Sequence, residues 1–398
     1  MDHIRHAFEE HLAGTSPHPI GLDIVHAEGC VLTDRSGVQY LDLVAGLAVN
    51  NVGHRHPKVI AAIKDQCDRY LHVIPYGEFI QEPQVRYARL LTSLLPDGLD
   101  RVFFVNSGTE AIEAALKLAK RVTGRTAMVA CHKSYHGSTH GSLSITGNEV
   151  KKYRNRPLLP DVHFITFNDL NELDRIDERV ACVVVEPIQG DAGVRAASRE
   201  WLHATRAKCT DTGAMLVFDE VQTGFGRTGR NFAFEHHGVL PDILVLGKAL
   251  GGGLPMGAFV ASKEHMSLLT HDPVLGHITT FGGHPLPCVS GAAALEVMIA
   301  EALPRNAQDM GALFKELLVH PDVREVRGEG LMLAVELGDP CRVQEVVHAC
   351  LAQGVLGFWF LSCPTAFRIA PPLTINEEQV RRASQVILAA IDGSPPRS

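Results

Sequence analysis

The chain has 398 residues, 45% of them hydrophobic, which is enough for a large core and predicts two or three domains. Its 37 basic and 45 acidic residues give a net charge of −8 with no basic run, so nucleic acid is not expected as a partner. The acidic N-terminus MDHIRHAFEEHLAG lacks the apolar segment of a signal peptide, and no apolar run approaches the ~18 residues of a membrane span, so no membrane partner is expected.

The cysteine and histidine residues indicate whether disulfides or a metal site are expected. The nine cysteines are scattered without a C-x-x-C pair, which is typical of reduced core thiols in a cytoplasmic protein. His132, His136 and His140 are evenly spaced, but Gly137 and Gly141 among them predict a loop over residues 131–141 instead of one helix face. Because H-E-x-x-H is also missing, the sequence does not favour a metal site.

The predicted elements begin with a hairpin and continue as alternating strands and helices. The segment CVLTDRSGVQYLDL predicts two strands around a turn at residues 34–37. Short apolar runs without polar alternation then predict strands covered on both faces. These runs are residues 102–106, 126–130, 162–166, 181–185, 214–218, 242–246 and 257–261. Helical patterns at residues 110–121 and 200–209 lie in two of the gaps.

This alternation predicts an α/β fold with a seven-stranded, mostly parallel sheet. The gap before the run at residues 257–261 is only about ten residues, too short for a crossover helix with its loops. That strand is therefore predicted to run antiparallel to the others.

The chain ends predict a second, smaller α+β domain. After residue 300 the pattern changes to a helix, a strand at residues 331–337 and a final helix from Asn376. We expect a large domain at residues 55–295 and a small domain made of residues 1–54 and 296–398. The tail GSPPRS is expected to be disordered.

The stretch AMLVFDEVQTGFGRTGR ends a buried strand in two adjacent carboxylates, Asp219 and Glu220. By itself, this segment fits three interpretations. It could belong to a P-loop NTPase, to a cofactor enzyme in which the acid contacts a ring nitrogen, or to a structural ion pair or N-cap. The NTPase needs G-x-x-x-x-G-K-[ST], but the only Gly-Lys pair has Asp242 in place of the first Gly and Ala249 in place of Ser or Thr.

Three groups that pyridoxal phosphate requires are predicted at the carboxyl edge of the sheet. Ser107, Gly108 and Thr109 open a helix, where free N–H groups and the dipole favour a phosphate, although an ordinary N-cap fits equally well. Lys248 follows a buried strand beside a glycine-rich turn, where desolvation would lower its pKa and free the amine as a nucleophile. With Asp219 as the acid for a ring nitrogen, these groups predict a pyridoxal phosphate site.

At these motifs the chain resembles the class III, fold type I pyridoxal phosphate aminotransferases, especially the acetylornithine, ornithine and 4-aminobutyrate branch. The similar motifs are YLDLVAGLAVNNVGHRHPKVIAAI, NSGTEAIEAALKLAKR, VVVEPIQGDAGV, LVFDEVQTGFGRTG, LGKALGGGLPMGAF, TTFGGHPL, VRGEGLMLAVEL and FRIAPPL, and they cover most of the chain. The resemblance implies transamination between an amino acid or amine donor and an oxo acid, with 2-oxoglutarate or glutamate as one partner.

By this resemblance, Lys248 and Asp219 are the catalytic residues: Lys248 is the Schiff-base lysine, and Asp219 keeps the pyridine nitrogen protonated. The residues implied to bind the cofactor are these two with Ser107, Gly108, Thr109, Tyr135, His136, Glu186, Gln222 and Thr280. Among them, Tyr135 stacks on the ring and Gln222 contacts the phenolate oxygen. Thr280 reaches the phosphate in the neighbouring subunit, which implies a homodimer with shared sites.

The expected substrate site departs from the family pattern. Ser138 stands where F-H-G-R-T carries an Arg, and a hydroxyl cannot make the bidentate charged contact of a guanidinium. The donor is therefore expected to lack the usual far carboxylate contact, unless another residue supplies the cation. Arg368 matches the family Arg that receives the α-carboxylate, and Asp191 is one methylene shorter than the Glu that masks this Arg in ornithine-type enzymes.

Other reactions on the same scaffold stay open as alternatives. An aminomutase of the glutamate-semialdehyde type and a dialkylglycine-decarboxylase-like enzyme share the lysine and the aspartate, whereas GFGRTG and PIQG favour the aminotransferases. A binding protein without activity is disfavoured because Lys248 and Asp219 are both present.

Overall fold

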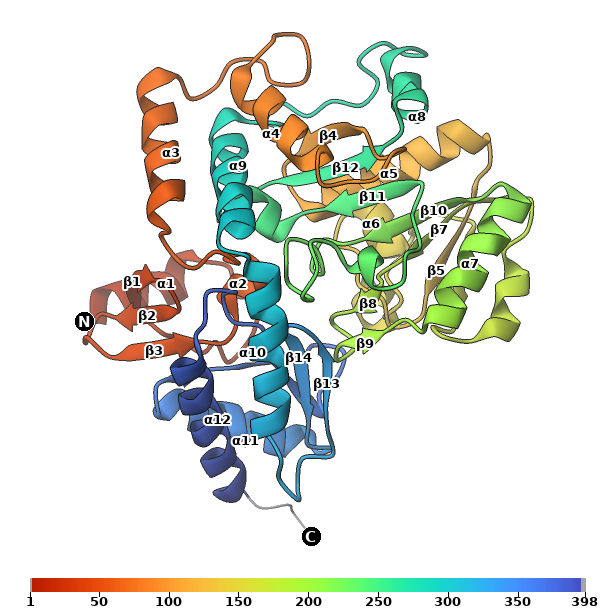
Figure 1. Ribbon diagram of the computed structural model, residues 1–398. Coiled ribbons are helices and arrows are strands. Elements are labelled where there is room, and N and C mark those ends of the chain that lie inside the picture. The colour runs from red at the N-terminus through yellow and green to blue at the C-terminus, as the bar shows by residue number, and fades with distance from the viewer. Residues whose placement is uncertain (1, 395–398) are drawn as a thin grey trace.

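The computed structural model describes residues 2–394, and Figure 1 shows a large sheet flanked by helices above a smaller unit to which both chain ends contribute. The tail that was predicted to be disordered lies outside the described residues from residue 395 onward. Before it, Gly393 caps the last helix, α12 Glu377–Asp392. The helix predicted from Asn376 is confirmed, because the Asn376 side chain accepts a hydrogen bond from the first turn of α12.

The large sheet contains the seven strands predicted from the sequence. They are β4 Arg101–Val105, β5 Ala127–Cys131, β6 Val162–Ile165, β7 Val180–Val185, β10 Met215–Asp219, β11 Ile243–Leu246 and β12 Gly257–Ala261. Their order is β4-β12-β11-β10-β7-β5-β6. β12 pairs antiparallel with β11 and β4, and the other neighbours pair in parallel. The mostly parallel sheet with one antiparallel strand is confirmed.

Both faces of this sheet are buried, which explains why its strands show no polar alternation. Along β10, Leu216 belongs to one apolar cluster and the next residue, Val217, belongs to the other. α5 Gly108–Thr123 packs into the cluster of Val217, whereas α7 Arg199–Thr212 and α9 Pro285–Ala300 pack into the cluster of Leu216. The helices predicted at residues 110–121 and 200–209 lie within α5 and α7.

Two further sheets come from the chain ends. β1 Ile24–Glu28, β2 Val31–Asp34 and β3 Gln39–Asp42 are antiparallel neighbours, which confirms the hairpin turn after Asp34. β15 Val355–Leu356 pairs with β3 in parallel, so segments from the two ends of the chain share a sheet. The last sheet has the order β13 Glu325–Glu329, β14 Met332–Glu336, β17 Ala366–Ile369 and β16 Phe358–Trp359.

The remaining named helices surround the sheets. They are α1 Asp2–His11, α2 Ala45–Ala48, α3 Pro57–Arg69, α4 Glu82–Thr92, α6 His140–Ser144, α8 Lys263–Ser267, α10 Leu303–Leu317 and α11 Pro340–Ala352. A two-stranded hairpin, β8 Ile188–Gln189 with β9 Arg195–Ala196, projects after β7. The boundaries predicted between the two domains stay a prediction, and α9 continues through residue 295.

The loop predicted at residues 131–141 is wrong at both ends. Cys131 still belongs to β5, and α6 begins at His140. The start of α6 is stabilised by a carboxylate from another helix, because Glu113 of α5 accepts hydrogen bonds from the N–H groups of Gly141 and Ser142 at 2.8 and 3.0 Å. Sequence signals near α6 could not reveal a cap supplied from α5.

The cysteines and the helix lengths can be compared with the sequence predictions. All nine cysteines are free thiols, but Cys67 and Cys341 are exposed, so the prediction that they lie in the core is wrong for these two. Among residues 2–394, no single helix has the length and apolar character to cross a membrane. The pair α9 and α10, bent by 65°, reaches that threshold by length and composition alone.

Candidate active site

The carboxyl ends of the parallel strands and the loops that follow them enclose a cavity of about 270 Å³. Ten residues singled out from the sequence line it: Gly108, Thr109, Tyr135, His136, Ser138, Glu186, Asp191, Asp219, Gln222 and Lys248. Ligands of α/β sheets bind at this edge, where loops from neighbouring strands meet. A cavity of this size approaches the usual range of small-molecule sites.

Asp219 is the buried acid of the cavity. It ends β10, and its side chain is 6% exposed. Its Oδ2 lies 2.7 Å from Nδ1 of His136, and its Oδ1 accepts a hydrogen bond from the N–H of Val221 at 3.1 Å. Burial lowers the pKa of His136, but the hydrogen bond and charge of Asp219 outweigh it and raise that pKa above its ordinary value. The hydrogen bond and the charge of Asp219 therefore favour the cationic form of the His136 ring.

Lys248 is the amine of the cavity. It follows Gly247 at the end of β11 and adopts φ +48°, a left-handed conformation that is uncommon for a residue with a side chain. Desolvation lowers its pKa from 10.5 to about 8, although the charge of Asp219 acts in the opposite direction. A substantial fraction of the amine is therefore unprotonated and nucleophilic near neutral pH.

The start of α5, where an anion site was predicted, lies beside the acid and the amine of the cavity. Ser107 is the N-cap, since its hydroxyl accepts a hydrogen bond from the N–H of Glu110 at 3.3 Å. The Thr109 hydroxyl is also engaged, at 2.8 Å from Thr139 and 2.6 Å from Ser142. Ser107 is therefore an ordinary cap, and Gly108 and Thr109 of the first turn line the cavity. The binding of a phosphate at this helix start stays a prediction.

Close packing leaves little room for a side chain at Gly108 and Gly137, two glycines that line the cavity. A Cβ on Gly108 would lie 2.9 Å from the Val221 side chain, and a Cβ on Gly137 would overlap the Thr109 hydroxyl. Glycine is therefore needed at position 108, where α5 approaches Val221, and at position 137, where the loop of residues 135–139 approaches Thr109.

Glu186 follows β7 and shapes the cavity through the backbone. Its carboxylate accepts hydrogen bonds from the N–H of Tyr135 at 2.9 Å and of Gly190 at 3.1 Å. Burial raises its pKa to about 7. Both of these partners are backbone groups, so Glu186 positions the Tyr135 loop and the β8–β9 hairpin around the site.

Of the residues expected to contact substrate, Ser138 and Asp191 line the cavity, and Arg368 lies beside Asp191. The Tyr135 hydroxyl is 3.2 Å from the hydroxyl of Ser138. Asp191, at the tip of the β8–β9 hairpin, faces Arg368 of β17 at 3.8 Å, which is an ion pair beyond hydrogen-bond length. Burial lowers the pKa of Arg368, and its Nε has no hydrogen-bond partner among the described residues. Such a guanidinium is poised for an anion.

Three predicted site residues do not line the cavity. Ser107 and Arg368 lie next to lining residues, as the cap of α5 and the partner of Asp191. Thr280 is exposed at the surface of this chain, between Thr279, which contacts Asn106, and the exposed ring of Phe281.

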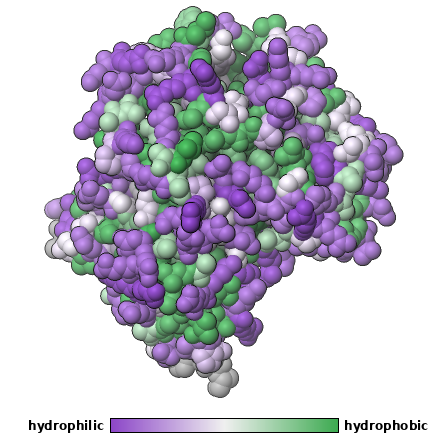
Figure 2. Space-filling view, viewed as in Figure 1, coloured by the Kyte–Doolittle hydropathy of each residue, from purple (hydrophilic) through white to green (hydrophobic). Residues whose placement is uncertain are grey.

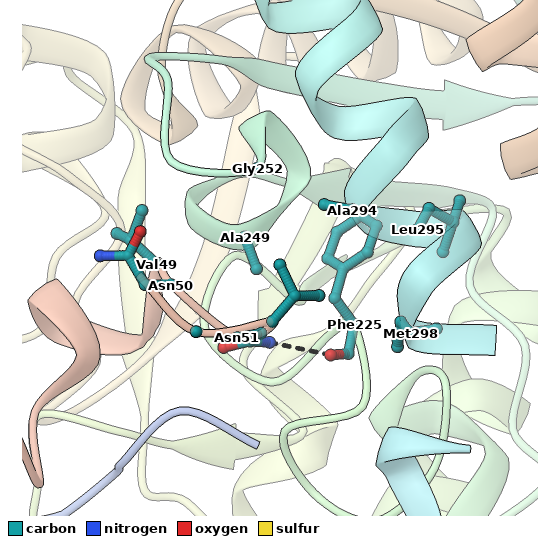
Figure 3. A pocket seen from close by; sticks show the side chains of 11 residues that line it. Val49, Asn50, Asn51, Phe225, Ala249, Gly252, Ala294, Leu295 and Met298 are labelled. Carbon is teal, nitrogen blue, oxygen red and sulfur yellow. Dashed lines mark hydrogen bonds between the residues drawn. The ribbon is translucent and has the colours of Figure 1, made fainter. Parts of the chain in front are cut away.

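A much smaller cavity of about 20 Å³ lies behind the turn that follows Lys248 (Figure 3). The turn contributes Ala249 and Gly252, and α9 contributes Met298. Figure 3 also shows Asn51 bonded to the carbonyl oxygen of Phe225, at 2.8 Å. The volume is close to that of one water molecule, so this cavity is a packing void and not a substrate site.

The structure adds residues that the sequence analysis missed. Ile188, Val221 and Thr223 line the cavity, and the rule that strand ends point to the site could have found them. Lys151 contacts Asp191, but no local motif distinguishes it from Lys152 beside it. Among residues 2–394, no group of three or more His, Cys, Asp or Glu side chains is arranged to hold a metal ion.

Comparisons with known proteins identify the family of this chain. The family model "Aminotransferase class-III" matches residues 13–391. The acetylornithine aminotransferase of Methanopyrus kandleri is 41% identical over 387 residues, which is 96% of this chain and 97% of that protein. The [LysW]-aminoadipate semialdehyde/glutamate semialdehyde transaminase of Sulfurisphaera tokodaii is 41% identical, over 92% of this chain and 93% of that protein.

Solved structures show the same similarity. The ornithine aminotransferase of Toxoplasma gondii superposes with a TM-score of 0.91 at 30% identity, over 98% of this chain and 94% of that one, and it is described with partial occupancy of PLP at its active site. An amine transaminase from an uncultivated Pseudomonas species, in a PLP-bound form, has a TM-score of 0.89 at 28% identity, over 97% of this chain and 100% of that one.

Proposed function

Because the chain belongs to the class-III aminotransferase family and is a pyridoxal-phosphate-dependent transaminase of fold type I, we propose roles for its site residues. We also propose one of its substrates. The observation that carries the proposal is the meeting of Lys248, Asp219 and the start of α5 in one cavity. The cofactor fits this donor set, because it needs an amine, an acid and an anion site. When bound, pyridoxal phosphate supplies an electron sink for the negative charge left on a substrate carbon that loses a proton.

We assign the proton transfer to Lys248. Its Nζ would hold the cofactor covalently, and as a free amine it would accept the proton that the substrate Cα loses. Its lowered pKa of about 8 supports this role, since a base works best when its pKa lies near the operating pH.

We propose that Asp219 contacts the pyridine nitrogen of the cofactor. A buried carboxylate raises the pKa of a neighbouring nitrogen and keeps its proton in place at neutral pH. His136 orients the Asp219 carboxylate through their 2.7 Å contact. The N–H groups of Gly108 and Thr109 would hold the phosphate at the positive end of α5. Tyr135 and Gln222 line the same cavity and would contact the ring and its phenolate oxygen.

The substrate end is assigned to Arg368. Its unsatisfied Nε and its long 3.8 Å distance to Asp191 support binding of a substrate carboxylate. We propose glutamate or 2-oxoglutarate as one partner and an amine or amino acid without the usual far carboxylate contact at Ser138 as the other.

We further propose a homodimer in the cytoplasm. Large apolar side chains are exposed near Thr280, among them Phe281, which is 56% exposed, and Val274, which is 72% exposed. Figure 2 shows further hydrophobic patches scattered among polar atoms on the face it presents. A second copy covering the Thr280 segment would bring that hydroxyl to its partner's phosphate site. Light scattering should report twice the 43.2 kDa chain mass. The free cysteines fit a reducing compartment.

Replacing Lys248 by Ala tests the assignment. The variant should lose turnover and the visible absorbance of the covalently bound cofactor, while a panel of amino donors with 2-oxoglutarate and pyruvate identifies the substrates of the wild-type enzyme. An active, yellow Lys248→Ala enzyme would refute the role of Lys248.

A further inference from the structure

Asp191 is held by a group that none of the roles above uses. Its Oδ2 accepts hydrogen bonds from Nζ of Lys151 at 2.8 Å and from the hydroxyl of Ser362 at 2.6 Å. Its Oδ1 accepts a longer bond from the N–H of Leu361 at 3.3 Å. The nearest contact with Arg368 is 3.8 Å. The contact with Arg368 is therefore the longest of the four.

Lys151 and Ser362, which hold Asp191, are themselves held by neighbouring side chains. Nζ of Lys151 lies 4.4 Å from the ring centroid of Tyr135, a cation–π contact that fixes the ammonium beside the cavity. The amide of Asn148 donates to the Ser362 hydroxyl at 2.9 Å, which links the Lys151 segment to the loop before β17. The Lys151 side chain is 22% exposed and that of Asp191 is 12% exposed, so water competes little for this pair.

Two cations therefore compete for one carboxylate. Burial raises the pKa of Asp191, but Lys151 and Ser362 outweigh burial, and its pKa ends below the ordinary value, so Asp191 remains anionic. Arg368 lies 3.8 Å from Asp191 and makes a cation–π contact with Phe360 at 4.6 Å. If Asp191 moved toward Arg368, it would occupy the guanidinium that a substrate carboxylate needs.

We propose that Lys151 is a positioning residue that sets substrate specificity: it holds Asp191 away from Arg368 and so keeps the Arg368 guanidinium open for a substrate carboxylate. The proposal rests on the proposed role of Arg368. It implies that Lys151 touches neither cofactor nor substrate and acts only through Asp191.

The test is a mutant cycle followed by steady-state kinetics of the holoenzyme, with the better of 2-oxoglutarate and pyruvate as acceptor. Lys151→Met keeps most of the length of the side chain but removes its charge. It should raise the KM for the acceptor about tenfold or more, with little change in kcat. Lys151→Arg should restore most of the affinity. In an Asp191→Asn background, the same Lys151→Met change should alter KM less than about twofold, because no carboxylate is left to compete.

Lys152 offers a matched control. Its ammonium lies 3.7 Å from Glu149 and 4.1 Å over the ring of Phe164, away from Asp191. Lys152→Met should leave the KM for the acceptor unchanged. If Lys151→Met does not fold, Ser362→Ala removes the other short bond to Asp191 and should raise KM in the same direction by a smaller factor.

Two results would overturn the inference: a wild-type KM in Lys151→Met, or an equal rise of KM in the Asp191→Asn background. The second would mean that Lys151 acts on the site without Asp191. These results are distinguishable from failure of the proposed function. If Arg368→Ala leaves KM unchanged, the role of Arg368 is wrong; if it raises KM while Lys151→Met does not, only the inference is wrong.

Discussion

The amine of Lys248 should react with small aldehydes far faster at neutral pH than an ordinary lysine. Desolvation lowers its pKa from 10.5 to about 8. At pH 7 this change raises the unprotonated fraction from about 0.03% to about 10%, a gain of roughly 300-fold. The experiment is reductive methylation of the cofactor-free enzyme with formaldehyde and cyanoborohydride over a series of pH values. Peptide mass spectrometry measures methylation of Lys248, with Nα-acetyllysine amide as an internal reference.

The expected midpoint for Lys248 is about pH 8. A midpoint equal to that of the reference would refute the reasoning that the cavity desolvates this amine. The same shift has a consequence for stability. Between about pH 8 and 10.5 the unfolded chain binds more protons than the folded one, so the stability of the cofactor-free enzyme should rise with pH across this window. Lys248→Met should be more stable than wild type by about 3 kcal/mol at pH 7, and the difference should vanish above pH 10.5.

Three further predictions follow from individual contacts. Asp219→Asn should retain the cofactor, as judged by absorbance, but should lose about 100-fold or more in kcat because the ring nitrogen is no longer held protonated; near-normal turnover would contradict this. Arg368→Ala should raise the KM for the oxo acid about 10- to 100-fold through the loss of a charge-assisted contact, and an unchanged KM would count against it. Gly291→Ala would place a Cβ into the carbonyl of Leu250 and within 2.6 Å of the Tyr87 ring, so it should lower the free energy of unfolding by about 1–3 kcal/mol and weaken cofactor retention; an unaltered melting temperature would be inconsistent with the close packing of α9 on the turn after Lys248.

Much of the large sheet was predictable because its signals are local. Burial on both faces produces continuous apolar runs, and all seven strands lie where these runs do. The short gap between β11 and β12 leaves no room for a crossover helix, and this chain-length limit determines that β12 is antiparallel. Lys248 and Asp219 follow such runs, so their meeting at one edge of the sheet could also be predicted.

Contacts between distant segments were decided only by the tertiary structure. The pairing of His136 with Asp219, the restraint of Asp191 by Lys151, and the surface position of Thr280 have no signal in neighbouring residues. These contacts depend on which strands lie side by side and on how each loop folds over the strand ends. The sequence by itself determined which chemical groups the chain carries and at which strand ends they appear; only the packing of the chain decided which charge faces which, because a hydrogen bond or an ion pair forms over a few ångströms regardless of separation along the chain.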